Sequence, residues 1–227
     1  MAILGGPGSG KSTVVHLLPR FYDASSGRVL IDGIDTREVT LKSLRSNVGI
    51  VLQDVFVFSA SIKDNIAYGT IERSFDEVVR AARMAELHDF VEGLPDGYDT
   101  WVGERGVTLS GGQRQRLAIA RTILTDPAIL VLDDSTSSVD VATEALIQSA
   151  LSKSATGRTT FVIANRLSTV RNADLIMVMG QGRIVERGSH EQLMDLDGEY
   201  RKIYDLQLTS QAEPDLLGRA SQIPGES

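Results

Sequence analysis

The sequence has no cysteine among its 227 residues, which excludes disulfides, thiol chemistry and cysteine-ligated structural zinc. No apolar run approaches the roughly 18 residues that span a bilayer, so we expect no transmembrane helix. Acidic residues outnumber basic ones by 30 to 23, and no basic stripe is present, so nucleic acid is not an expected partner. Apolar residues still make up 42% of the chain, enough for the core of one large or two small domains.

Residues 5–13 read GGPGSGKST and match the phosphate-loop pattern G-x-x-x-x-G-K-[ST]. Glycines let backbone N–H groups wrap around a polyphosphate, Lys11 can reach the β- and γ-phosphates, and the Ser12 hydroxyl can hold Mg²⁺. An apolar run (2–4) precedes the loop, and a helix-like run (13–18) follows it. The alternative is a glycine-rich turn that matches by chance. We predict that the phosphates of ATP are bound by Gly5, Gly6, Pro7, Gly8, Ser9, Gly10, Lys11, Ser12 and Thr13.

Strand-like and helix-like stretches alternate, which predicts an α/β fold. The strand-like runs are apolar and β-branched, as is typical of strands buried on both faces; they cover 29–31, 48–52, 128–132, 160–163 and 175–179. Gly-Gln-Gly at 180–182 predicts a hairpin. Helical patterns cover 75–94 and 140–154, and 54–124 is interpreted as a helical insertion. The tail, 209–227, is rich in proline and glycine and predicted to be disordered.

A second motif is the apolar run 129–132 followed by Asp133. In phosphate-loop NTPases a strand-end aspartate lies near Mg²⁺. The alternative is structural, because strands often end in aspartate before a turn. Asp134 follows and could act on an attacking water; its structural alternative is a loop or cap carboxylate.

A third motif, LSGGQRQR at 109–116, precedes the helix-like run 117–121. Ser110 is predicted to cap this helix, with two glycines just inside it. A helix start with free N–H groups can bind an anion. The alternative is an ordinary capped helix.

Together these motifs resemble the nucleotide-binding domain of ATP-binding cassette (ABC) exporters of the multidrug and lipid type. Gln53 resembles the family's Q-loop, 138–140 its D-loop, and 100–106 the X-loop that precedes the signature at 109–116. The resemblance covers 1–208. It implies a P-loop NTPase core of the RecA-like type, formed by 1–53 and 125–208, with a helical signature subdomain at 54–124.

The resemblance also implies a mechanism. Such domains dimerise head to tail around two ATP molecules, so Ser110, Gly111, Gly112 and Gln113 would contact nucleotide held by the partner's loop. Mg²⁺ would lie near Ser12, Gln53 and Asp133. Closure of the dimer would move transmembrane domains, which places the chain at the cytoplasmic face of a membrane.

Two departures from the family pattern concern catalysis. The family has glutamate where this chain has Asp134, and a switch histidine where it has Asn165. Both fall in one composite site together with Gln53, whereas the signature is intact. This asymmetry resembles the degenerate half of a heterodimeric exporter, whose own ATPase site is weak. Laboratory substitution or random divergence is the competing explanation.

A third departure is that no residues here correspond to the family's upstream adenine-stacking aromatic and its N-terminal antiparallel strands. We therefore expect the chain to be the C-terminal portion of a longer polypeptide; a mis-assigned start or a free-standing subunit is the alternative. Two other functions stay open: an ATP-binding regulatory module with little turnover, and a soluble ABC ATPase of DNA repair or translation. The X-loop and the acidic charge argue against the second.

Overall fold

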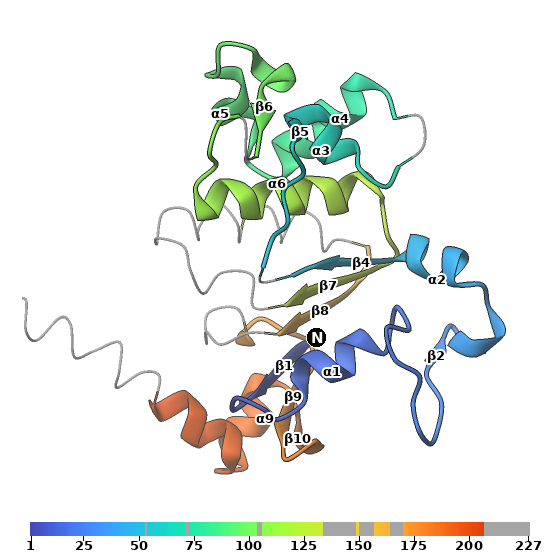
Figure 1. Cartoon of the computed structure of the whole chain (residues 1–227). Coiled ribbons are helices and arrows are strands. Elements are labelled where there is room, and N and C mark those ends of the chain that lie inside the picture. The colour runs from blue at the N-terminus through green and yellow to red at the C-terminus, as the bar shows by residue number, and fades with distance from the viewer. Residues whose placement is uncertain are drawn as a thin grey trace, which may run out of the picture. The chain divides into compact units, whose positions relative to one another are not determined.

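The structure is a computed structural model and describes residues 1–52, 54–70, 73–103, 106–133, 149, 157–163 and 170–206 (Figure 1). The chain forms two compact units, one of Met1–Lys11 with Ala164–Ser227 and the other of Ser12–Ile163. The helix predicted over 140–154 lies outside the described residues except for Ser149, and the whole tail 209–227 lies outside them. The domain boundaries expected at 53/54 and 124/125 stay predictions.

The first unit contains strands on both sides of β9 (Ile176–Gly180). Strand β1 (Ala2–Gly5) pairs with β9 in parallel, and β10 (Arg183–Gly188) pairs with it antiparallel. Gln181 and Gly182 have φ of 50° and 75°, the left-handed conformation that a two-residue hairpin turn requires. This confirms the hairpin predicted from 180–182. Helix α9 (His190–Asp195) follows β10 after Ser189.

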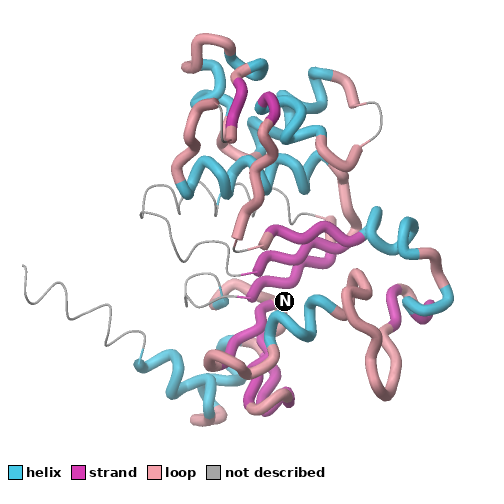
Figure 2. The backbone as a smooth tube through the Cα atoms, in the orientation of Figure 1, coloured by secondary structure: helices cyan, strands magenta, loops and turns pink. Residues whose placement is uncertain are grey.

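The second unit contains a parallel sheet in which β7 (Ile129–Asp133) lies between β4 (Val48–Val51) and β8 (Thr159–Ile163) (Figure 2). The first four residues of β7 are buried, as expected for a central parallel strand covered on both faces. The prediction of an α/β fold with parallel strands is confirmed.

The strand expected at 29–31 does not join this sheet as a doubly buried strand. Among the described residues, strand β2 (Leu30–Ile31) pairs only with β3 (Ile34–Asp35), and Leu30 and Ile34 are exposed. The cause is the turn between them, because Asp32 and Gly33 at φ of 50° and 82° reverse the chain after two residues. A short 3₁₀ helix (Thr36–Glu38) and α2 (Leu41–Asn47) follow.

The longest helix in the helical part of the second unit is α6 (Gly111–Leu124), most of whose residues are buried. The other elements there are α3 (Ile62–Ala67), α4 (Phe75–Met84), α5 (His88–Glu92) and a 3₁₀ helix (Gly97–Asp99). The purely helical interpretation of 54–124 was incomplete, since β5 (Ala60–Ser61) pairs with β6 (Trp101–Val102). The single helical pattern over 75–94 is also interrupted, because Glu86 takes a φ of 53° and ends α4.

Helix α1 (Lys11–His16) begins and ends two residues before the predicted run 13–18, and its buried residue is Val15. Leu17 and Leu18 fall outside it because their N–H groups bond three residues back, to Val14 and Val15, which tightens the chain into a 3₁₀-like turn. Among the described residues, no helix is long and apolar enough to cross a membrane.

Candidate nucleotide-binding site

The loop after β1 depends on glycine at particular positions. Gly5, Gly8 and Gly10 have φ of 149°, 73° and 98°. A side chain at Gly5 would collide with the backbone carbonyl of Met179 on β9 and would lie 2.7 Å from Ser9 Oγ. A Cβ at Gly6 or Gly8 would meet nothing within 4 Å. The backbone therefore lies against β9 at Gly5 and borders open space at Gly6 and Gly8.

The Lys11 ammonium lies across this loop. Its Nζ donates to the carbonyl oxygens of Gly5 at 2.8 Å and Gly6 at 3.0 Å. The loop itself is anchored, because the Ser9 N–H bonds to Gly6 and the Gly182 N–H bonds to the Ser9 carbonyl at 3.1 Å. These bonds hold a positive charge at the mouth of a backbone loop, where carbonyl partners can be exchanged for phosphate oxygens.

The next residue, Ser12, belongs to the second unit and reaches the strand-end carboxylate. Ser12 Oγ donates to Asp133 Oδ1 at 3.4 Å, although 121 residues separate the two in the chain. A hydroxyl beside one carboxylate suits Mg²⁺, which takes few protein oxygens and completes its shell with waters and substrate phosphates. The residues present thus fit the ion. A larger protein ligand set is not seen, because the described residues hold no cluster of three or more His, Asp or Glu side chains arranged to bind a metal.

The signature segment is built as a capped helix start. The Ser110 hydroxyl accepts the Gln113 N–H at 3.3 Å, and the Gln113 side-chain carbonyl accepts the Ser110 N–H at 2.8 Å. This capping box confirms Ser110 as the N-cap of α6. Ser110 and Gly111 are exposed, and Gly112 is buried. The serine hydroxyl keeps its own proton for a further acceptor.

Several residues that the sequence predicted for the site lie outside the described residues. They are Gln53, Asp134 and Asn165, the D-loop residues 138–140, and two X-loop residues, Glu104 and Arg105. The roles assigned to them stay predictions.

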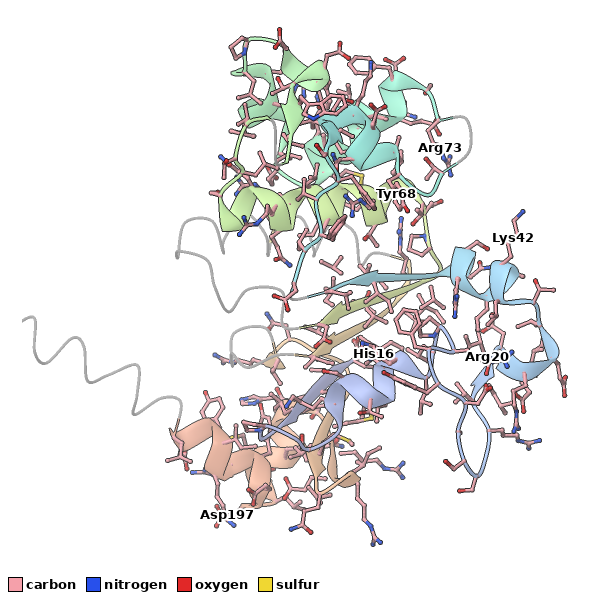
Figure 3. The ribbon with its side chains drawn as sticks, viewed as in Figure 1. His16, Arg20, Lys42, Tyr68, Arg73 and Asp197 are labelled. Atoms are coloured by element: carbon pink, nitrogen blue, oxygen red, sulfur yellow. The ribbon has the colours of Figure 1, made fainter. Side chains whose placement is uncertain are left out.

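The sequence did not reveal an interaction made by Arg121, which lies on α6, the same helix that Ser110 caps. Its guanidinium donates to the Asn65 carbonyl at 2.8 Å and the Phe56 carbonyl at 3.2 Å. It also lies over the rings of Phe58 and Tyr68, 5.2 Å and 5.8 Å from their centroids (Figure 3 labels Tyr68). Burial lowers the pKa of Arg121. The signature helix is thereby joined to the segment that follows Gln53.

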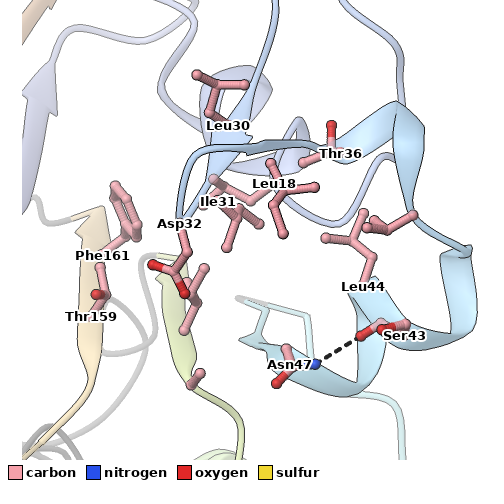
Figure 4. Close-up of a pocket in the computed structure, with 14 residues that line it drawn as sticks. Leu18, Leu30, Ile31, Asp32, Thr36, Ser43, Leu44, Asn47, Thr159 and Phe161 are labelled. Atoms are coloured by element: carbon pink, nitrogen blue, oxygen red, sulfur yellow. Dashed lines mark hydrogen bonds between the residues drawn. The ribbon is translucent and has the colours of Figure 1, made fainter.

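An apolar pocket of about 460 Å³ lies in the same unit (Figure 4). Its lining includes Leu18, Leu30, Leu44, Ile129 and Phe161. Ile129 begins β7, whereas Asp133 ends it. The pocket therefore lies at the opposite end of the strand from the Ser12–Asp133 pair.

A phosphate-binding loop, a helix directly after it and a parallel strand ending in aspartate define the class of P-loop nucleotide-binding domains. Comparison with known proteins gives the family. Residues 1–137 match the family model described as ABC transporter. The chain belongs to the ABC transporter family.

Individual relatives agree with this assignment. An ATP-dependent lipid A-core flippase of Syntrophus aciditrophicus (strain SB) is 50% identical over 219 residues, which are 96% of this chain and 36% of the flippase. ABC transporter B family member 18 of Arabidopsis thaliana is 50% identical over 228 residues, which cover 98% of this chain and 19% of that protein. The chain thus spans about a third or less of these relatives.

A solved structure extends the likeness to three dimensions. The structure of a bacterial Atm1-family ABC exporter with ATP bound matches with a TM-score of 0.85 and 50% identity, over 91% of this chain and 36% of that one. The chain is an ATP-binding domain of the type found in such exporters.

Proposed function

We propose that this chain binds and hydrolyses MgATP to drive an exporter. The observation that carries the proposal is the loop geometry, in which Lys11 lies across a backbone that needs glycine at Gly5 and is open beside Gly6 and Gly8. Lys11 and the backbone N–H groups of the loop up to Thr13, except at Pro7, which has none, hold the phosphates, with Lys11 supplying the main positive charge. Ser12, Gln53 and Asp133 hold Mg²⁺, which when bound neutralises charge on the phosphates.

The proposed catalytic unit is a head-to-tail pair of nucleotide-binding domains, supported by the exposure of Ser110 and Gly111 at the capped start of α6. Ser110, Gly111 and Gly112 contact the γ-phosphate held by the partner's loop. Gln113 adjoins the same nucleotide and supports the Ser110 cap. ATP closes the pair and hydrolysis opens it. The pair lies at the cytoplasmic face of a membrane, and the transmembrane domains follow its motion. The flippase relative and the Atm1-family exporter, each nearly three times as long as the matched region, support a transport role.

We further propose that this chain is the weaker half of a heterodimer. Asp134 is one methylene shorter than the family's glutamate, and a displacement of about 1 Å can cost about 100-fold in rate. Asn165 can donate a hydrogen bond to a phosphate but cannot carry a positive charge. An ATP-clamping regulatory module with little turnover is the second candidate, and the same two residues favour it.

Binding tests the first proposal. Lys11→Ala should weaken binding of a fluorescent ATP analogue by about 10- to 150-fold, because bonds to a charged group contribute about 1.5–3 kcal/mol. Lys42→Ala on exposed α2 removes the same charge elsewhere and should leave affinity unchanged (Figure 3). Equal affinities for the two variants would show that the loop does not bind the nucleotide.

Turnover measurements test the proposal that this chain is the weaker half of a heterodimer. Asp134→Glu combined with Asn165→His should raise single-turnover hydrolysis at this chain's loop, since the carboxylate regains its reach and the switch its charge. Asp134→Asn alone should reduce transporter ATPase only a few-fold, against the roughly 10²–10⁴-fold typical of a positioned general base. A large loss from Asp134→Asn without a gain from the double variant would make this an ordinary active ATPase. No turnover in either, with binding intact, would favour the regulatory module.

A further inference from the structure

His16 lies one helical turn after Ser12 on α1, so both side chains project from the same face. The Nε2 atom of His16 lies 4.0 Å from Asp133 Oδ2, and Ser12 Oγ donates to Oδ1 of the same carboxylate. The Nε2 atom is buried and has no hydrogen-bond partner among the described residues. One helix therefore directs two polar atoms at the two oxygens of Asp133.

The imidazole packs against a neighbouring aromatic ring (Figure 3 labels His16). The ring of Phe21 meets it edge-on, with the centroids 5.4 Å apart at 64°. The Arg45 guanidinium lies 5.6 Å above the Phe21 ring and donates to the Pro19 carbonyl at 3.1 Å. The imidazole is therefore packed against Phe21, which we call its brace, and its Nε2 atom is directed at the Asp133 carboxylate.

We propose that His16 is a positioning residue for the divalent-cation site, acting through Asp133; the inference rests on the proposed MgATP function. A carboxylate held only through Oδ1 can rotate about its terminal bond, which is a soft torsion. At 4.0 Å the pair is longer than a hydrogen bond, and a small rotation brings Oδ2 within reach of an Nε2–H. Donation to Oδ2 then fixes the carboxylate plane and leaves Oδ1 beside Ser12 for the cation. Outer partners of this kind typically change metal affinity by about 10- to 100-fold.

Manganese(II) titration of the full chain, followed by electron paramagnetic resonance with a non-hydrolysable ATP analogue, tests this. His16→Leu should weaken Mn²⁺ binding by about 10- to 100-fold. His16→Gln should recover most of the loss, because its amide N–H can reach the same oxygen. Affinity for the nucleotide without metal should change less than about 2-fold in both, since His16 acts through Asp133, which is proposed to hold the cation and not the phosphates.

His88→Gln is the matched control, because it removes a histidine on α5 whose ring bonds the hydroxyl of Tyr98 and not Asp133; it should leave Mn²⁺ affinity unchanged. Where His16→Leu fails to fold, Phe21→Leu, which removes only the brace, should weaken Mn²⁺ binding to a smaller extent. Wild-type Mn²⁺ affinity in the folded His16 variants, or Gln no better than Leu, would overturn the positioning role. Absence of Mn²⁺ and nucleotide binding in the wild-type chain would overturn the proposed function itself.

Discussion

Two regions of this molecule are proposed to meet phosphate, and they are built in different ways. The loop Gly5–Lys11 takes its shape from backbone conformations with positive φ and from the contact of Gly5 with β9. The start of α6 takes its shape from two side chains, Ser110 and Gln113, that satisfy each other's N–H groups. A site that depends on backbone shape should tolerate no added atom where its backbone lies against a neighbouring strand, as at Gly5. A site that depends on a side-chain cap should lose a moderate amount of unfolding free energy when the cap is removed.

The largest effect is expected at Gly5. Gly5→Ala forces a methyl group against the Met179 carbonyl in an unfavourable φ of 149°. Overpacking of this kind costs about 1–3 kcal/mol of unfolding free energy, which lowers the melting temperature by roughly 2–4 °C per kcal/mol in a chain of this size. ATP affinity should fall with it. Denaturant unfolding and nucleotide titration measure the two quantities.

Gly6→Ala is the matched control, because its Cβ would meet nothing within 4 Å and its φ is not positive. It should change stability by less than about 0.5 kcal/mol. If both variants lose the same stability, the loop's dependence on contact with β9 is contradicted.

An intermediate effect is expected at Ser110. Ser110→Ala should cost about 0.5–2 kcal/mol because an N-cap is lost. Ser189→Ala removes the cap of α9, which has the same box with Gln192, and should cost a similar amount. Only Ser110→Ala should lower the ATPase of the assembled transporter, because only that hydroxyl faces the partner's nucleotide in the proposed function. Equal ATPase in the two variants would remove Ser110 from the composite site.

The smallest expected effect is a pH dependence of stability that a charged capping box shows and a neutral one does not. At the start of α4, the Ser74 N–H bonds to the Glu77 carboxylate at 2.8 Å and Arg73 contributes an ion pair, which together lower the pKa of Glu77 to about 2. A depressed carboxylate pKa stabilises the folded state above the unfolded value of about 4.5, and this stabilisation is lost as the pH falls from about 4.5 towards 2. The neutral Ser110–Gln113 box has no such dependence.

Amide chemical shifts followed by nuclear magnetic resonance from pH 6 to about pH 1.5, a range that includes the Glu77 pKa of about 2, would detect the difference. The Ser74 amide should move with pH, the Ser110 amide should not, and Glu77→Gln should abolish the Ser74 response. Parallel movement of both amides would mean that the acid change is global and not a property of the Glu77 cap.

Predictions from local pattern succeeded where the pattern itself determines the structure. The parallel strands β4, β7 and β8, the β9–β10 turn and the Ser110 cap each depend on residues within a few positions of one another, so their sequences suffice. The run 29–31 was misjudged because β-branched composition does not reveal whether a strand has neighbours on both sides. The strands β5 and β6 were missed because two-residue pairings leave almost no periodicity.

Residue type and short spacing were enough to predict the phosphate-loop motif, the strand-end Asp133, the capped signature helix and the family resemblance. The folded chain was needed to show that Ser12 and His16 approach the two oxygens of a carboxylate more than 100 residues away. It was likewise needed to show that Gly5 has no room for a side chain and that Arg121 joins α6 to Asn65 and Phe56. Such contacts join segments far apart in the chain, and which segments meet is set by sheet order and core packing, to which no local pattern refers.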